Sequence, residues 1–109
     1  MKISFDFDST LGEVRVQRLA RKFIDEGHEV WIITSREKEE TTDPKWNRDI
    51  FSVAKKLNIP KENIKFSGGV AKWKYLEGFD IHFDDSIVEI EAIEENLNNC
   101  VGVLILDYD

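Results

Sequence analysis

The stretch His28–Thr34, HEVWIIT, is the segment that decides the fold. Its core, Val-Trp-Ile-Ile, is almost continuously apolar and rich in β-branched and aromatic side chains, which predicts a strand buried on both faces. Strands of this kind are typical of parallel sheets covered by helices on either side. Gly27, directly before the stretch, is well placed to end a preceding helix in a left-handed conformation.

Outward from this strand, short apolar runs alternate with amphipathic helical patterns. We expect further strands at 2–7, 63–69, 79–83 and 101–106. Helices are expected after Gly12, from 44 to near 58, over 71–76, and from a Ser86/Glu89 capping box through Ile90, Ile93 and Leu97. Asp43 and Pro44 are a plausible cap and first position for the second long helix. The alternation predicts a single domain, 1–109, with a three-layer α/β/α, Rossmann-like parallel sheet of about five strands.

The composition fits one small globular domain. The chain has 109 residues, of which 41% are hydrophobic, and a net charge of −7. That charge disfavours a surface that neutralises phosphates along a nucleic acid, but it does not exclude a compact substrate with one phosphate. We expect a cytoplasmic protein without a membrane partner. Cys100 is a single cysteine, and the sequence shows neither a signal-peptide pattern nor a stretch of ~20 apolar residues.

Acidic residues follow two of the expected strands. Asp6 and Asp8 end the first, in ISFDFDSTL, and Asp84 and Asp85 end the fourth. Carboxyl ends of parallel strands meet at one sheet edge, where ligands bind close to the point at which strand order reverses. Closely packed carboxylates repel one another, and a hard divalent cation with oxygen ligands such as Mg²⁺ relieves that repulsion.

Each of these motifs also has an ordinary explanation. Asp, Ser and Thr favour turns and helix starts, and a lone lysine such as Lys72 is usually a surface residue, with Lys74 competing for any role given to it. His82 is best explained as a strand residue with a local hydrogen bond, because imidazole suits Mg²⁺ poorly. The coincidence of several motifs at one edge is what favours a functional site.

The motifs resemble those of the haloacid dehalogenase-like (HAD) phosphatases. DFDSTL is similar to the first motif of that family, D-x-D-x-T, and VWIITSR is similar to the second, an apolar strand ending in Thr or Ser. Lys72 stands where the third-motif lysine is expected, and IHFDDS looks like the acidic fourth motif. All four occur in the order of the family, between Ile3 and Ser86.

The resemblance implies a Mg²⁺-dependent phosphomonoesterase, with nucleotidases among the candidate activities. Asp6 is expected to attack phosphorus and form an aspartyl-phosphate, and Asp8 to move protons to and from the leaving group and water. Residues two apart in a strand share a face, so both could address one substrate. The remaining expected roles are metal binding by Asp6, the Asp8 backbone carbonyl, Asp84 and Asp85, and phosphate binding by Thr34, Ser35 and Lys72.

The sequence departs from the family in having almost no room for a flap after Thr10, and no gap is long enough for a cap domain. We therefore expect an open site, shielded only by the loop 36–45, and a phosphorylated substrate of unknown size. A nucleic-acid end is conceivable but disfavoured by the acidic charge. Arg36 could approach the phosphate and Trp46, Asn47 and Arg48 the leaving group, although the simpler expectation is that Trp46 packs on the helix and the others are solvated.

Two other functions remain as alternatives. One is a catalytically weak HAD-like module that binds a phosphorylated partner or a metal. The other is a receiver domain of two-component signalling, whose acidic pair usually follows the first strand and whose phosphoacceptor follows the third. The order of acids along this chain, D-x-D first and DD later, counts against the receiver domain.

Overall fold

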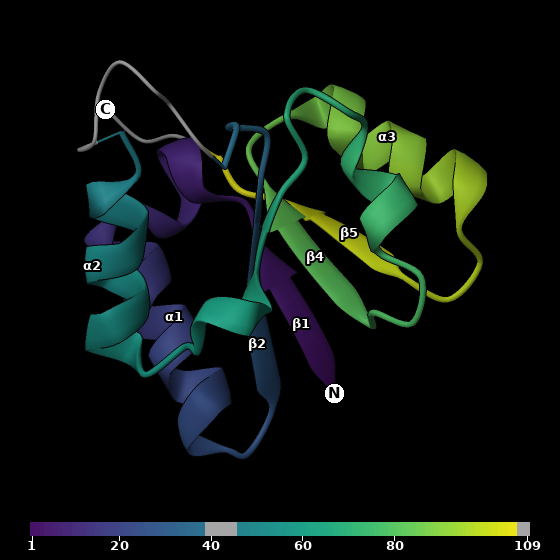
Figure 1. Ribbon diagram of the computed structural model, residues 1–109. Coiled ribbons are helices and arrows are strands. Elements are labelled where there is room, and N and C mark those ends of the chain that lie inside the picture. Colours follow the sequence, from purple (N-terminus) through teal and green to yellow (C-terminus); the bar gives the residue numbers. More distant parts are fainter. Residues whose placement is uncertain (39–45, 107–109) are drawn as a thin grey trace.

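Five strands form one all-parallel sheet in the computed structural model, which describes residues 1–38 and 46–106 (Figure 1). The spatial order is β3-β2-β1-β4-β5, with β1 in the centre. The strands are β1 (Lys2–Phe5), β2 (Glu29–Thr34), β3 (Ile64–Phe66), β4 (Ile81–Asp84) and β5 (Val101–Leu104). This order belongs to the doubly wound α/β folds and confirms the expected Rossmann-like parallel sheet.

Helices cover both faces of the sheet, which confirms the three-layer arrangement. Helices α1 (Val14–Asp25) and α2 (Arg48–Leu57) lie together on one face, and α3 (Ile87–Asn96) lies on the other, as Figure 1 shows. A short 3₁₀ helix, Lys72–Tyr75, accompanies α3. None of the described helices has the length and apolarity needed to cross a membrane.

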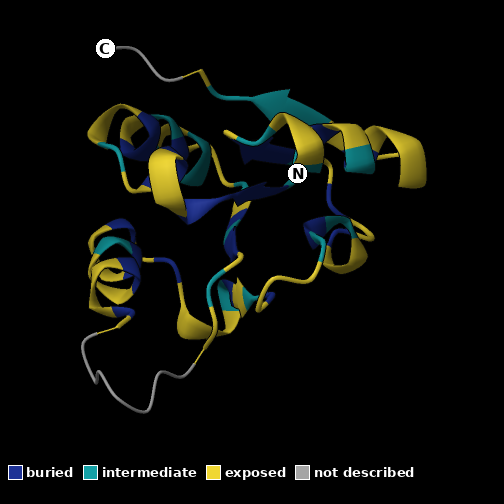
Figure 2. Cartoon of the chain, turned by 90° about the horizontal axis from the view of Figure 1, so that it is seen from above, coloured by how far each residue is buried: buried dark blue, intermediate teal, exposed yellow. Residues whose placement is uncertain are grey.

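The core is divided between the two faces by the alternation of side chains in β2. Ile32 belongs to the cluster beneath α1 and α2, whereas its neighbour Ile33 packs with Leu76, Phe79 and Ile93 on the α3 side. Both isoleucines are completely buried, and the buried sheet lies between the exposed outer faces of the helices in Figure 2. The apolar run HEVWIIT was therefore interpreted correctly as a strand buried on both faces.

Helix ends follow the expected chemistry in part. Gly27 has a φ of +90° and its amide donates to the carbonyl of Ile24, which ends α1 in the predicted left-handed conformation. Ser86 caps α3, its Oγ accepting from the amide of Glu89 at 3.4 Å. The reciprocal half of the predicted capping box is wrong, because the Glu89 carboxylate accepts from the amide of Lys72 instead.

The first strand is shorter than predicted, and this changes the setting of the D-x-D motif. Strand β1 ends at Phe5, and an irregular helical turn, Phe7–Leu11, follows. The turn closes through bonds from the amide of Leu11 to the carbonyl of Asp6 and from that of Gly12 to Phe7, with Ser9 at a φ of +59°. Asp6 and Asp8 therefore do not share one face of a strand, and that premise was wrong.

The other expected strands were also drawn too long at one or both ends. Strand β3 stops at Phe66 and β5 at Leu104, whereas β4 begins at Ile81 and includes Asp84. Only Gly12 and Glu13 separate the helical turn Phe7–Leu11 from α1, so no flap stands at this point. The expected helix start at Asp43 and Pro44 and much of the loop 36–45 lie outside the described residues.

Candidate active site

The strand order reverses between β1 and β4, and the candidate site lies at the carboxyl end of these two strands. Phe5 pairs with Phe83 in register, and the amide of Asp6 donates to the carbonyl of Phe83 at 2.8 Å. This pairing places Asp6, directly after β1, beside Asp84, the last residue of β4. Open α/β sheets bind their ligands at such a point.

Lys72 joins these two acids. Its Nζ lies 2.7 Å from Oδ1 of Asp6 and 2.8 Å from Oδ2 of Asp84, and the lysine is 3% exposed. Glu89 on α3 fixes the start of the 3₁₀ helix that carries Lys72 by accepting from its amide at 3.1 Å. Lys74 is exposed and lies over the ring of Trp73. The structure thus selects Lys72 over Lys74 as the lysine of the site.

Asp6, Asp84 and Asp85 form a group in which one carboxylate oxygen from each lies within 4.8 Å of the others. Burial raises the pKa of Asp6 to about 7, against the charge of Lys72, and the neighbouring Asp84 raises it further. Burial also acts to raise the pKa of Asp84, but the hydrogen bond from His82 and the charge of Lys72 outweigh it and lower that pKa. Three carboxylates against one ammonium leave two negative charges when all are ionised.

This donor set fits a small divalent cation. Oxygens on opposite sides of Mg²⁺ lie roughly 4 Å apart, so slight closure of the three carboxylates would bring them to coordination distance. The two excess negative charges match the charge of the ion. Among the described residues, Asp6, Asp84 and Asp85 are the ones that would hold it by their side chains. Participation of the Asp8 carbonyl stays a prediction.

A buried histidine, His82, forms a hydrogen bond with Asp84 and orients its carboxylate. His82 lies next to Ser4 in register, with Nδ1 2.7 Å from Ser4 Oγ and Nε2 2.8 Å from Asp84 Oδ2. Burial lowers the pKa of His82, so a neutral ring accepts from the serine and donates to the aspartate. The prediction of a strand histidine with a local hydrogen bond is confirmed. The hydrogen bond between Ser4 and His82 was not predicted, although a serine within the buried central strand could have indicated a polar partner inside the core.

Thr34, which was assigned to phosphate binding, and Thr10 of the D-x-D-x-T motif differ in their surroundings. Thr10 Oγ1 donates to Oδ2 of Asp6 across a long 3.4 Å. Thr34 ends β2 fully buried, and its Oγ1 accepts from the amide of Arg36 at 3.2 Å, which leaves its own proton for another acceptor. Ser35 is exposed, and its carbonyl accepts from the amide of Gly69. Phosphate binding by Thr34 and Ser35 stays a prediction.

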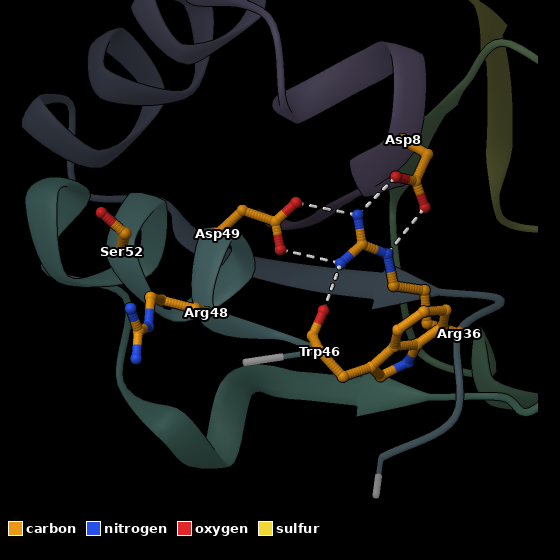
Figure 3. A pocket seen from close by; sticks show the side chains of 6 residues that line it. All are labelled: Asp8, Arg36, Trp46, Arg48, Asp49 and Ser52. Atoms are coloured by element: carbon orange, nitrogen blue, oxygen red, sulfur yellow. Dashed lines mark hydrogen bonds and ion pairs between the residues drawn. The ribbon is translucent and has the colours of Figure 1, made fainter. Parts of the chain in front are cut away.

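Asp8 lies outside the buried cluster formed by Asp6, Lys72 and Asp84, and it faces Arg36 (Figure 3). The guanidinium donates to Oδ1 and Oδ2 of Asp8 at 2.6 and 3.0 Å, to both oxygens of Asp49 at 2.8 and 2.9 Å, and to the carbonyl of Trp46 at 3.2 Å. These bonds use all five N–H groups of an arginine. The expectation that Arg36 contacts the substrate phosphate therefore loses support, since no donor is free for it. The hydrogen bonds from Arg36 also lower the pKa of Asp49.

The residues at the start of α2 correct one further expectation. Asn47 is buried and not solvated, because its Nδ2 donates to the carbonyls of Glu37 and Lys38 at 3.0 and 2.9 Å. Arg48 is exposed, as expected, and Trp46 is 44% exposed, so its indole is only partly packed. The pairing of Arg36 with Asp49 was not anticipated, and the sequence carries no local signal for a contact across thirteen positions.

Comparison with known proteins adds nothing to these observations. The chain matches no known family model, and no curated protein is significantly similar to it in sequence. Any assignment of function therefore depends on the geometry of the site itself.

Proposed function

We propose that the protein is a Mg²⁺-dependent phosphohydrolase of the HAD type that acts on phosphomonoesters through an aspartyl-phosphate on Asp6. The observation that carries the proposal is the buried contact of Asp6, Lys72 and Asp84 at the point where the strand order reverses. A lysine between two carboxylates there suits stabilisation of a phosphoryl group better than a role in folding alone, because burying such charges is costly.

The two oxygens of Asp6 are not equivalent. Oδ1 accepts a short bond from Lys72, whereas within the described part of the chain Oδ2 accepts only the long bond from Thr10, so Oδ2 is the more available nucleophile. Its lone pair would form the new O–P bond as the ester P–O bond breaks. Bound Mg²⁺ would neutralise the phosphate and the nucleophile during this attack.

Asp8 would complete the proton transfers. With its pair to Arg36 opened, a protonated Asp8 would give its proton to the leaving alkoxide, and the resulting carboxylate would later remove one from the water that cleaves the bond between phosphorus and Asp6. Both oxygens of Asp8 accept from Arg36, but the side chain is 56% exposed. A leaving group would therefore approach Asp8 from its solvent side, next to Arg36.

A binding module remains the second candidate, because two observations favour it. Both oxygens of Asp8 accept from Arg36, and among the described residues no flap follows the D-x-D motif to exclude water, which disfavours rapid turnover. A receiver domain is disfavoured, because such domains have the strand order 2-1-3-4-5 and this sheet does not. In addition, β3 is followed by Ser67, Gly68 and Gly69 and carries no acid at that edge.

Release of phosphate from p-nitrophenyl phosphate tests the proposal. Wild-type protein should require Mg²⁺, and Asp6→Asn should reduce the rate by at least ~1000-fold because the nucleophile is lost. Asp25→Asn, an exposed change at the end of α1, is the matched control and should leave the rate unchanged. Equal rates for wild type and Asp6→Asn would refute the hydrolase.

The binding module predicts a different pattern. It would show a rise in melting temperature with millimolar Mg²⁺, since an ion that binds only the folded state stabilises it, and no phosphate release from a broad panel of phosphomonoesters. Asp85→Asn should diminish that rise, because Asp85 is an exposed member of the metal-binding group.

A further inference from the structure

A cavity lies between α1 and α2, the two helices that lie together on one face of the sheet (Figure 1). Its volume is about 380 Å³, which falls within the roughly 300–1,000 Å³ of small-molecule sites. Three of its six lining residues are cationic and none is acidic: Val14, Gln17, Arg18, Arg21, Lys56 and Leu57. The cavity therefore shares no residue with the carboxylate-rich candidate active site and differs from it in charge.

A buried glutamine holds one of the three cations in place. Gln17 is 6% exposed, its Nε2 donates to the carbonyl of Leu11 at 3.0 Å, and its Oε1 accepts from Nζ of Lys56 at 3.0 Å. A neutral amide thus fixes the ammonium without cancelling its charge, whereas a glutamate at position 17 would neutralise it. An ammonium has three N–H donors, and within the described part of the chain Lys56 uses one of them.

The two arginines of the cavity also lack an acidic partner. Nη2 of Arg21 donates to the carbonyl of Lys56 at 2.6 Å, in the last turn of α2, so its acceptor is again neutral. Arg18 is exposed, and among the residues that the structure describes its side chain forms no hydrogen bond or ion pair. Residues three apart in a helix are neighbours on its surface, so the two guanidinium groups extend from one side of α1.

The charges of the surrounding helices add to the attraction for anions. Helices α1 and α2 carry seven cationic residues against the two carboxylates of Asp25 and Asp49, whereas α3, on the other face of the sheet, carries four glutamates and no cationic residue. The α1–α2 face is therefore positive, although the chain as a whole has a net charge of −7. A local positive field of this kind raises the concentration of anions beside it.

We infer that the cavity between α1 and α2 binds a compact anion with two or more phosphate or carboxylate groups. A guanidinium binds two oxygens of either group side by side, and the ammonium of Lys56 has donors left for a further oxygen. An anion with a single charge would leave most of the cationic groups without a partner. The volume suits a small molecule better than a polymer. This binding site is separate from the proposed phosphohydrolase activity and does not depend on it.

Calorimetric titration with pyrophosphate and with citrate, in metal-free buffer, tests the inference. We expect saturable binding of at least one of them, with a Kd of about 1 mM or lower. Tighter binding of pyrophosphate would assign phosphate groups to the ligand, and tighter binding of citrate would assign carboxylates. Asp6→Asn should bind the anion as the wild type does, so the result is independent of the hydrolase. Absence of saturable binding of both anions up to about 10 mM would overturn the inference.

Variants that remove one cation each define the site. Arg18→Gln and Lys56→Gln should each weaken binding by about 10-fold, because each removes a charge-assisted hydrogen bond. Arg18 is exposed, so Arg18→Gln keeps the test valid if loss of the bond to Gln17 disturbs the folding of Lys56→Gln. Lys22→Gln removes an exposed charge of α1 outside the cavity and should weaken binding by less than about 2-fold, since exposed charges are screened. Equal weakening by Lys22→Gln and Arg18→Gln would refute a defined site.

Nuclear magnetic resonance locates the bound anion directly. Backbone amide signals of residues 14–21 and 56–57 should shift during the titration, together with the side-chain amide of Gln17. Shifts centred instead on Asp6, Thr34 and Lys72 would place the anion in the candidate active site and overturn the inference. Tighter binding of a short single-stranded DNA than of either small anion would also overturn the assignment of a small ligand.

Discussion

Replacement of Lys72 by methionine tests the buried cluster most severely in terms of stability. The side chain of Lys72 is 4% exposed and its ammonium bonds to Asp6 and Asp84, whose side chains are 6% and 1% exposed. Methionine fills a similar volume, so the main effect is to leave two buried carboxylates without their cation. Removal of one partner from a buried ion pair costs about 3–5 kcal/mol.

The low end of that range applies to Lys72→Met. Asp6 has a pKa of about 7 even with the lysine present, so it can take up a proton near neutrality and reduce the repulsion. We therefore expect a loss of about 3 kcal/mol in the free energy of unfolding at pH 8, which corresponds to a fall of about 10–20 °C in melting temperature for a domain of this size. Thermal unfolding without Mg²⁺, followed by circular dichroism, measures it.

The pH dependence of the loss has a definite sign. Without Lys72 the pKa values of the two carboxyls rise in the folded state, so the variant is penalised most above those values, where the unfolded chain is ionised at no cost. The deficit should therefore be larger at pH 8 than at pH 5.5. Lys74→Met, two residues away and exposed, should change the melting temperature by less than about 3 °C at either pH. A deficit of that small size in Lys72→Met would refute the buried cluster.

Two further predictions concern other parts of the molecule. Burial, and to a smaller extent the charge of Asp80, raises the pKa of the Cys100 thiol to about 11. Alkylation of Cys100 by iodoacetamide at pH 8 should therefore be about 100-fold slower in the folded than in the unfolded protein. Folded and unfolded rates within a few-fold of each other would contradict the burial of Cys100. Since the thiolate is disfavoured in the folded state, stability should also decline as pH rises from about 9 towards 11. Arg36→Met should lower the free energy of unfolding, measured in urea, by about 1–2 kcal/mol, a modest loss because the carboxylates of Asp8 and Asp49 are more than half exposed. Arg18→Met, an exposed control on α1, should have almost no effect. Equal losses in the two variants would refute the role of Arg36 in linking Asp8 to Asp49.

The layered fold could be predicted because its determinants are local. Ile32 and Ile33 are adjacent in sequence and point to opposite faces, so a strand in which both are apolar requires cover on both sides. Gly27 adopts a left-handed conformation, and its position directly after a helical pattern predicts this from the local sequence alone. The meeting of Asp6 with Asp84 and Asp85 follows equally from parallel strands, whose carboxyl ends share one edge.

The rest of the site depends on contacts that no local pattern encodes. Strand β1 stops at Phe5 because the carbonyls of Asp6 and Phe7 accept bonds from Leu11 and Gly12, and in the turn that results the Asp8 side chain is more than half exposed and pairs with Arg36. The choice between Lys72 and Lys74 depends on how the 3₁₀ helix is fixed by Glu89 on α3. These features arise from packing between segments distant in sequence.

Chemical trapping of the intermediate tests the central claim most directly. Wild-type protein mixed with p-nitrophenyl phosphate and Mg²⁺, quenched in acid and reduced with borohydride, converts an aspartyl-phosphate to homoserine at the modified position, which peptide mass spectrometry identifies. We predict homoserine at position 6 alone, and none in a sample prepared without Mg²⁺. Phosphate release without homoserine at position 6, or homoserine at another aspartate, would contradict the assignment of Asp6 as the nucleophile.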